Sequence, residues 1–367
     1  MSHEAGVCGV DRSDTRSCAP GSAFTVPTQR CFARRDEFVV QLNRRALLQI
    51  GAALLTACAH LPSQPRVPPA YWGFTGPWDR HSNASIEAHG PSLERVITGW
   101  IALDTTSFRP VQLYPDSIGK QPVVAPRAIA LITTYLGGRF HPEIIRGLGD
   151  NAQVSALTAG AIASLIDSGG YRGVVIDFEG MTPRDLDRLL TVTKAVADSV
   201  RAHGVSTVVI AVPAGDTAAY PAGLLLQSAD LIMPVLYDQH WATSPPGAIA
   251  APDWVNRNLG MRVAEVGAAR IVAAFPLYGY RWRRSAATEV ISYDDARRLT
   301  TMTNTPLTRD HASATLHAVS PEGWEIWVSD HVLLETLVRE ARELGVTTFA
   351  LWRLGLEDPA VWDVIGR

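Results

Sequence analysis

The sequence of 367 residues lacks the excess of basic charge that is typical of nucleic-acid-binding proteins. Lys and Arg together number 33, against 36 Asp and Glu, so the formal net charge is −3 and the sequence pI is near 6.4. A chain with this balance has no positive field to attract a phosphate backbone. We therefore expect no nucleic-acid partner.

Cysteine is absent from most of the chain, because the four cysteines are Cys8, Cys18, Cys31 and Cys58. None of them has the spacing of a zinc or redox motif. This distribution excludes a thiol nucleophile and a disulfide framework from the folded part. The ten histidines show no paired ligand spacing either, so we predict no metal site and no cofactor.

The N-terminal part has no apolar run long enough to cross a bilayer. The apolar stretch Ala46–Ala57 follows two arginines and ends at Cys58; it has about 12 residues, whereas a transmembrane helix needs roughly 20. The order of basic, apolar and small residues is typical of a secretory signal, and Leu55-Thr56-Ala57-Cys58 resembles a bacterial lipobox, in which the cysteine is lipidated. The alternative is a buried apolar helix that happens to end in cysteine.

From this pattern we predict an exported lipoprotein of the bacterial cell envelope, anchored to the membrane through Cys58 on the periplasmic or surface face. Residues 1–57 are then a leader and signal, and residues 58–69, rich in proline, are a tether. The pair Arg44-Arg45 is similar to a twin-arginine export signal, but paired basic residues also occur in ordinary signals. The export route stays open.

The remainder, residues 70–367, alternates apolar strand-like runs with amphipathic helical stretches, which indicates a parallel sheet covered by helices. Eight candidate strands are Tyr71–Phe74, Val96–Ala102, Ile129–Thr134, Gly173–Phe178, Thr207–Val212, Leu231–Leu236, Ile271–Phe275 and Thr347–Trp352. Eight such units predict an α/β fold, a (β/α)8 TIM barrel. A stretch at about 284–328 breaks the alternation with a short helix, Tyr293–Met302, and two strands. We predict a small α+β insertion there, between strand seven and the last helix.

Two carboxylates close the fourth predicted strand, in the run Gly173-Val174-Val175-Ile176-Asp177-Phe178-Glu179. Side chains at i and i+2 of a strand share a face, so Asp177 and Glu179 both point toward the axis at the end of the barrel where such enzymes place their catalytic groups. Two carboxyls this close do not readily both ionise, which leaves a proton for general acid chemistry. From spacing alone, two solvated strand-end residues are an equal alternative.

This run resembles the signature of family 18 glycoside hydrolases, the chitinase family, in which Asp-x-Glu ends the fourth strand. Three further segments agree in order: Leu236–Trp241 after strand six, Pro276–Trp282 after strand seven, and Trp352–Pro359 after strand eight. The likeness covers about 71–367. It is strongest to the branch of spore-germination and cell-wall hydrolases, which have a small domain inserted after the seventh strand.

The resemblance implies a substrate-assisted, retaining hydrolysis of β-linked N-acetylglucosamine polymers such as peptidoglycan, poly-N-acetylglucosamine or chitin, in which the 2-acetamido oxygen of the sugar attacks C1. Glu179 is then the acid, Asp177 orients the acetamido group, and Tyr237 donates a hydrogen bond to its oxygen. Asp238 helps to bind the sugar or holds the site in place, and Trp352 stacks beneath the sugar. The implied partner is an N-acetylhexosamine polysaccharide, and we expect a monomer.

Several neighbouring residues allow two interpretations. Tyr278, Tyr280 and Trp282 form a sugar platform or pack the insertion against the barrel. His240 lines the cleft or is a structural histidine at a strand end. Trp72 and Trp78, near strand one, likewise either contact a sugar or serve packing.

The chain departs from the family signature at Arg172 and Val175, where the full pattern has acidic residues, and at Val235, where many members have methionine. A carboxylate at the position of Val175 normally shares a proton with its neighbour. The alternative function is therefore a carbohydrate-binding barrel of the cell envelope that turns over weakly or not at all.

Overall fold

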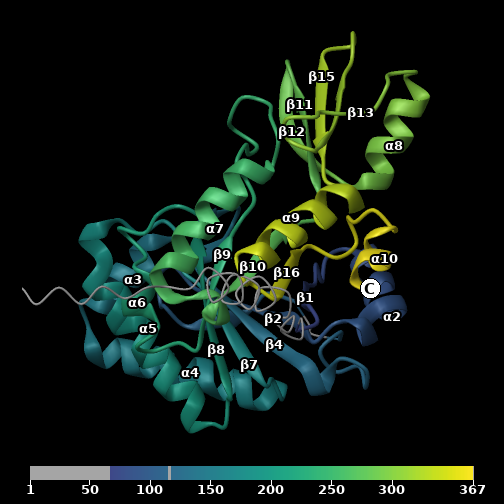
Figure 1. Ribbon diagram of the computed structural model, residues 1–367. Helices are drawn as coiled ribbons and strands as arrows, with labels where there is room; N and C mark the ends of the chain where they lie inside the picture. Colours follow the sequence, from purple (N-terminus) through teal and green to yellow (C-terminus); the bar gives the residue numbers. More distant parts are fainter. Residues whose placement is uncertain (1–66, 115–116, 367) are drawn as a thin grey trace, which may run out of the picture. The chain divides into compact units, whose positions relative to one another are not determined.

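Eight parallel strands form a closed barrel in the computed structural model, which describes residues 67–114 and 117–366 (Figure 1). The strands are β1 (Ala70–Phe74), β2 (Arg95–Leu103), β4 (Ala128–Thr133), β7 (Gly173–Asp177), β8 (Thr207–Pro213), β9 (Leu231–Val235), β10 (Val272–Pro276) and β16 (Thr348–Trp352). They pair in the order β1-β16-β10-β9-β8-β7-β4-β2, and the pairing of β1 with β2 closes the ring. The predicted (β/α)8 barrel is thus confirmed, with strand bounds shifted by one residue at most.

The strands are apolar on both faces because each face meets a different layer of the core. On β7, Val174 and Ile176 pack outward with the surrounding helices, whereas Val175 lies in the barrel interior together with Ile129, Leu131 and other inward side chains. All are buried from solvent. This two-sided burial explains why the barrel strands have continuous apolar runs rather than an alternating pattern.

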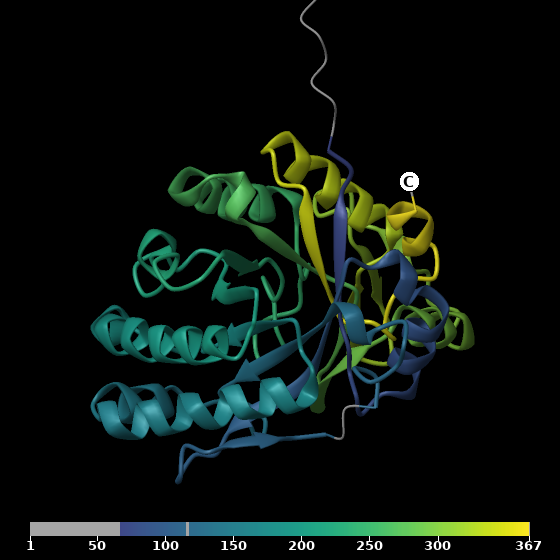
Figure 2. The same ribbon diagram turned by 90° about the horizontal axis from the view of Figure 1, so that it is seen from below.

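Helices cover the outside of the barrel, as the view from below shows (Figure 2). They are α2 (Arg80–His89), α3 (Pro142–Gly149), α4 (Ala152–Gly169), α5 (Leu186–Ala202), α6 (Ala222–Leu225), α7 (Pro252–Val266), α9 (His331–Glu343) and α10 (Val361–Ile365). Helix α5 is preceded by a 3-10 turn, Pro183–Asp185, closed by a capping box between Thr182 and Asp185. Asp330 caps α9, because its carboxylate accepts from the backbone N–H of Leu333.

The insertion is an antiparallel sheet with one helix. It consists of β11 (Gly279–Arg283), β12 (Ala286–Ile291), α8 (Tyr293–Met302), β13 (Thr308–Arg309), β14 (Leu316–Val319) and β15 (Trp324–Val328). The sheet begins at residue 279, before the expected start near 284, because β11 is its inner strand and pairs with both β12 and β15. In Figure 1 the sheet extends beyond the end of the barrel where β10 and β16 finish.

Two short pieces of structure had no counterpart in the sequence prediction. Strand β3 (Pro110–Gln112) pairs with β2, and a hairpin of β5 (Tyr135–Leu136) and β6 (Arg139–Phe140) follows β4. Helix α3 follows this hairpin directly, with His141 at its N-cap and Pro142 as its first residue.

The leader, the tether up to residue 66 and Cys58 lie outside the described residues. Within 67–114 and 117–366, no helix is both long and apolar enough to cross a membrane.

Candidate active site

Asp177 and Glu179 lie at the carboxyl end of β7 and line one cavity of about 680 Å³. Asp177 is the last residue of the strand. Phe178 between them is buried in the outer core, so the alternation of the chain turns both carboxyls to the inner side. The spacing therefore brings the two acids together, as predicted.

Thr133 holds the carboxylate of Asp177. Its hydroxyl donates a hydrogen bond of 2.9 Å to Asp177 Oδ2, and the hydroxyl oxygen of Thr133 in turn accepts a hydrogen bond from the backbone N–H of Tyr135. Thr133 is the last residue of β4 and lies directly opposite Asp177 in the sheet register. Burial raises the pKa of Asp177 above its usual value, and the Thr133 hydrogen bond partly offsets this rise.

Glu179 is the group best suited to hold a proton near neutral pH. Burial of its carboxyl raises its pKa, and the negative charges of Asp177 and Asp238 raise it further. All three effects favour the neutral acid. A carboxylic acid kept protonated in this way is able to act as a general acid.

Tyr237 and Asp238 follow β9 and face the same cavity. Burial and the three neighbouring carboxyls raise the pKa of Tyr237 well above its usual value, so its hydroxyl stays protonated and available as a donor. Asp238 accepts hydrogen bonds from the hydroxyls of Tyr278 and Tyr280. Burial raises the pKa of Asp238, and these two hydrogen bonds act in the opposite direction.

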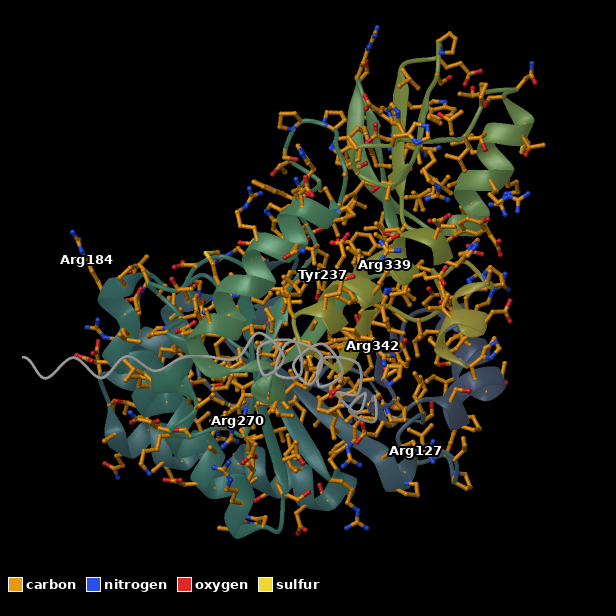
Figure 3. All side chains as sticks on the ribbon, viewed as in Figure 1. Arg127, Arg184, Tyr237, Arg270, Arg339 and Arg342 are labelled. Atoms are coloured by element: carbon orange, nitrogen blue, oxygen red, sulfur yellow. The ribbon has the colours of Figure 1, made fainter. Side chains whose placement is uncertain are left out.

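Trp352, the last residue of β16, forms the floor of the cavity together with other aromatic side chains. Its ring lies 5.0 Å from that of Phe74, 5.8 Å from that of Trp100 and 6.0 Å from that of Tyr237, with which it is nearly parallel. An indole held on several sides presents a flat apolar surface to a ligand. Figure 3 shows Tyr237 at the end of the barrel that carries the inserted sheet.

Two of the predicted site residues do not line this cavity. Trp282 is buried in a cluster with Tyr278 and Tyr280, and its indole N–H donates to the carbonyl of Ser244. His240 contacts its own loop through a hydrogen bond between Nδ1 and the carbonyl of Pro245. Tyr278 and Tyr280, by contrast, form part of the cavity wall.

Besides Trp78, whose role the sequence left open, the cavity has wall residues that the sequence did not single out. Arg353 lines the cavity beside Trp352; its guanidinium forms an ion pair with Asp79 and lies over the ring of Trp78 at 5.2 Å. Trp78 is 48% exposed and lines the cavity, whereas Trp72 is buried in the barrel interior. Tyr135 and Phe140 of the β5–β6 hairpin close another side.

A sequence signal existed for some of these residues. Tyr135 and Phe140 flank a turn that contains Gly137-Gly138, both with positive φ, and Gly-Gly between two short strand-like pieces is a hairpin signal. Thr133 and Thr134 end the third predicted strand, where a barrel places functional groups. The pairing of Arg353 with Asp79 joins residues far apart in sequence and left no local pattern.

The departures from the family signature have clear positions. Val175 lies in the barrel interior and lines the cavity below Asp177. Val235 is also part of the wall. Arg172 is exposed and precedes β7, so it lies at the opposite end of that strand from Asp177.

Among the described residues, one group of side chains has the arrangement to hold a metal ion: Asp330, His331 and Asp358. Its members are already paired, because Asp330 binds the guanidinium of Arg309 and His331 binds Asp358. This group does not line the cavity. It fastens the start of α9 to the segment after β16.

Comparison with known proteins gives no matching family model, but relatives are found by sequence and by structure. YdhD of Bacillus subtilis, named as a sporulation-specific glycosylase, is 26% identical over 249 residues, which are 64% of this chain and 59% of that protein. The chain thus spans less than two thirds of the length of this relative.

Two solved structures share the fold. The spore cortex-lytic enzyme SleL of Bacillus cereus has a TM-score of 0.72 at 18% identity, covering 84% of this chain and 76% of SleL. A GH18 chitinase from Cycas revoluta, solved with (GlcNAc)4, has a TM-score of 0.67 at 14% identity, covering 81% and 98%. The chain therefore resembles the chitinase-like family 18 glycosidases in sequence and in fold, as its motifs indicated.

Proposed function

We propose that this chain is a glycoside hydrolase that cleaves β-linked N-acetylhexosamine polysaccharides, with Glu179 as the catalytic acid. The observation that carries the proposal is the placement of Asp177 and Glu179 side by side in a cavity floored by Trp352, where burial and negative neighbours raise the pKa of Glu179. The names of the relatives, a glycosylase, a cortex-lytic enzyme and a chitinase, support the same class of reaction.

In the proposed reaction the sugar rests on Trp352 with its 2-acetamido group toward Asp177 and Tyr237. The acetamido oxygen forms a bond to C1 while the glycosidic C1–O bond breaks, and Glu179 gives its proton to the departing oxygen. The oxazolinium ion that results carries its positive charge near Asp177, whose carboxylate accepts the N–H. Water then attacks C1, the bond between C1 and the acetamido oxygen breaks so that the neutral acetamido group re-forms, and Glu179 takes the proton from that water.

Each neighbouring group has a task in this scheme. Thr133 keeps Asp177 oriented and favours its charged form. Tyr237, protonated because its pKa is raised well above the usual value, donates to the acetamido oxygen as that oxygen becomes a nucleophile. The tyrosine pair that binds Asp238 fixes this carboxylate as a hydrogen-bond acceptor for a sugar hydroxyl.

The substrates that fit this proposal are peptidoglycan, poly-N-acetylglucosamine and chitin, since all contain β-linked N-acetylglucosamine. We also propose that Cys58 carries a lipid that retains the protein at the cell envelope, which favours an envelope polymer. In a two-phase detergent separation, the full chain is then expected in the detergent phase and Cys58→Ala in the aqueous phase. Equal partition of both would contradict the lipid anchor without affecting the hydrolase.

The test of the hydrolase is turnover of N-acetylglucosamine oligomers and purified peptidoglycan by the parent, Glu179→Gln and Glu343→Gln. Glu343 is an exposed residue of α9, so its amide variant matches the chemical change away from the cavity. We expect cleavage by the parent and by Glu343→Gln, and a loss of at least roughly a hundredfold in Glu179→Gln, the contribution typical of general acid catalysis.

The second candidate function, a carbohydrate-binding barrel, is favoured by one observation: an apolar side chain, Val175, lies beneath Asp177 in the cavity. It predicts that the parent and Glu179→Gln bind the oligomers equally and that neither cleaves them. That outcome would assign the cavity to binding and remove the catalytic role of Glu179.

A further inference from the structure

Tyr220 fastens the backbone on both sides of Glu179. Its hydroxyl donates a hydrogen bond of 2.9 Å to the carbonyl of Phe178 and accepts one of 3.0 Å from the N–H of Met181. We propose that Tyr220 is the positioning residue for the acid, fixing the turn from which the Glu179 side chain enters the cavity. The inference rests on the proposed function of Glu179.

The orientation of the Glu179 side chain depends on the position of its backbone. The residue as a whole is half-buried and its carboxyl interacts electrostatically with Asp177 and Asp238, but among the described residues no hydrogen bond or ion pair of this carboxyl is found. Asp177, in contrast, has the side-chain bond from Thr133. A catalytic group without a side-chain partner keeps its geometry only if the chain that carries it is held in place.

Tyr220 is itself held rigidly. It is almost completely buried and lies in the loop between β8 and α6. Burial raises its pKa above the usual value for tyrosine, so the hydroxyl keeps its proton and donates to Phe178 over the whole pH range in which Glu179 titrates. The carbonyl of Tyr220 accepts a hydrogen bond of 2.8 Å from Arg262.

Arg262 of α7 anchors the whole loop. Its side chain is fully buried and also donates to the carbonyls of Pro213, Ala214 and Asp216 at 2.8 to 3.2 Å, with Glu265 as its ion-pair partner at 3.1 Å. A buried guanidinium tolerates this position only with such full pairing. The loop carbonyls therefore cannot move without leaving a buried charge unsatisfied.

The same loop also forms part of the cavity wall, through Pro213, Ala214 and Gly215. Gly215 fits closely against α7, because a Cβ there would lie 2.6 Å from Asn258 Oδ1. One rigid segment thus joins α7, the wall of the cavity and the turn of the acid. A side chain that served packing alone would not connect these three parts by hydrogen bonds.

The experiment compares the parent with Tyr220→Phe, which removes the hydroxyl and keeps the ring, and with Tyr71→Phe as matched control. Tyr71 is a similarly buried tyrosine of β1 that packs on Phe349 and does not line the cavity. We expect kcat on N-acetylglucosamine oligomers to fall roughly tenfold in Tyr220→Phe with KM changed less than about twofold, since misplacement of a catalytic group affects the chemical step. The control is expected to keep both constants.

A second readout does not need turnover. The carboxyl ¹³C signal of Glu179, assigned by its absence in Glu179→Gln, reports its pKa by NMR titration in each protein. Loosening the turn lets water reach the carboxyl, so its pKa is expected to fall toward the ordinary value in Tyr220→Phe and to stay raised in Tyr71→Phe. If the parent does not cleave, the proposed hydrolase fails, and this titration still decides the role of Tyr220.

Asp216→Ala supplies an independent variant if Tyr220→Phe does not fold. Asp216 is exposed, and its carboxylate accepts from the N–H of Ala219 at the turn that leads to Tyr220. Its removal is expected to lower kcat and the pKa of Glu179 in the same direction by smaller amounts. Unchanged kcat and unchanged titration in a folded Tyr220→Phe, or in Asp216→Ala where that is the variant obtained, would overturn the proposal.

Discussion

Thr133 and Asp177 lie directly opposite each other on the neighbouring strands β4 and β7, and the hydroxyl of Thr133 donates to Asp177 Oδ2 at 2.9 Å. The next residue, Thr134, is also fully buried, but its hydroxyl oxygen has no hydrogen-bond partner among the described residues. Of these two adjacent threonines, Thr133 thus has a hydroxyl that contacts an acid of the cavity, and Thr134 does not have such a contact among the described residues. The chain offers a closely matched pair of variants.

We expect Thr133→Val to lower kcat about tenfold, because a hydrogen bond to a charged group contributes about 1.5–3 kcal/mol. Without that bond the pKa of Asp177, already raised by burial, rises further, so Asp177 is neutral over more of the acidic range. The acidic limb of the kcat–pH profile should therefore move to higher pH. Thr134→Val, which removes an unpaired hydroxyl, should leave the profile in place; equal effects of both variants would contradict a specific role for Thr133.

We expect the raised pKa of Glu179 to make the stability of the folded protein depend on pH. Its pKa is raised in the folded protein, whereas in the unfolded chain a glutamate titrates at about 4.3. The folded state therefore binds this proton more tightly, and its stabilising contribution is complete below the unfolded pKa and is lost as the pH rises through the folded pKa.

Glutamine does not titrate, so Glu179→Gln escapes this loss. We expect its melting temperature to exceed that of the parent at pH 8 and the difference to shrink toward about pH 4, where the carboxyl is protonated in both states. Glu343→Gln, at an exposed position, should show no such trend. A constant difference between parent and Glu179→Gln at both pH values would argue against a raised pKa at Glu179.

The barrel could be predicted from sequence because its strands carry a strong local signal. Runs such as Gly173–Asp177 are buried on both faces, and such apolar runs recur with helical patterns between them. The acid pair was accessible for the same reason, since the two-residue period of a strand turns Asp177 and Glu179 to one face. Local periodicity and the position of a strand end were sufficient to predict the barrel and the acid pair.

The features that the sequence did not predict depend on contacts between distant segments of the chain. Tyr280 and Trp282 share one face of β11, yet Tyr280 lines the cavity whereas the indole N–H of Trp282 donates to the carbonyl of Ser244. The early start of the inserted sheet depends on the pairing of β11 with β15, two strands that residues 284–323 separate in the sequence. No local sequence pattern indicates either feature. The same holds for Tyr220, whose hydroxyl contacts the backbone beside Glu179 only in the folded protein.

Trp352 should govern substrate affinity through its stacked face. We expect Trp352→Ala to raise KM for N-acetylglucosamine oligomers roughly tenfold, since an aromatic contact contributes about 0.5–1.5 kcal/mol beyond its buried area. Trp241→Ala is the matched control, because that indole is 50% exposed and does not line the cavity. Melting curves must show that both variants fold; a similar KM for the two would remove Trp352 from the sugar site.

The acetamido group of the substrate is the last element of the scheme that can be tested directly. In the proposed reaction its oxygen is the nucleophile, delivered at a high effective concentration because it belongs to the same sugar. We expect fully de-N-acetylated oligomers to be cleaved at least roughly a thousandfold more slowly than N-acetylated ones of equal length. Calorimetric binding of both to Glu179→Gln separates weak binding from slow chemistry. Comparable cleavage of the two would exclude the acetamido group as the nucleophile and would remove from Asp177 its role of orienting that group; C1 would then be attacked by a protein carboxylate or directly by water.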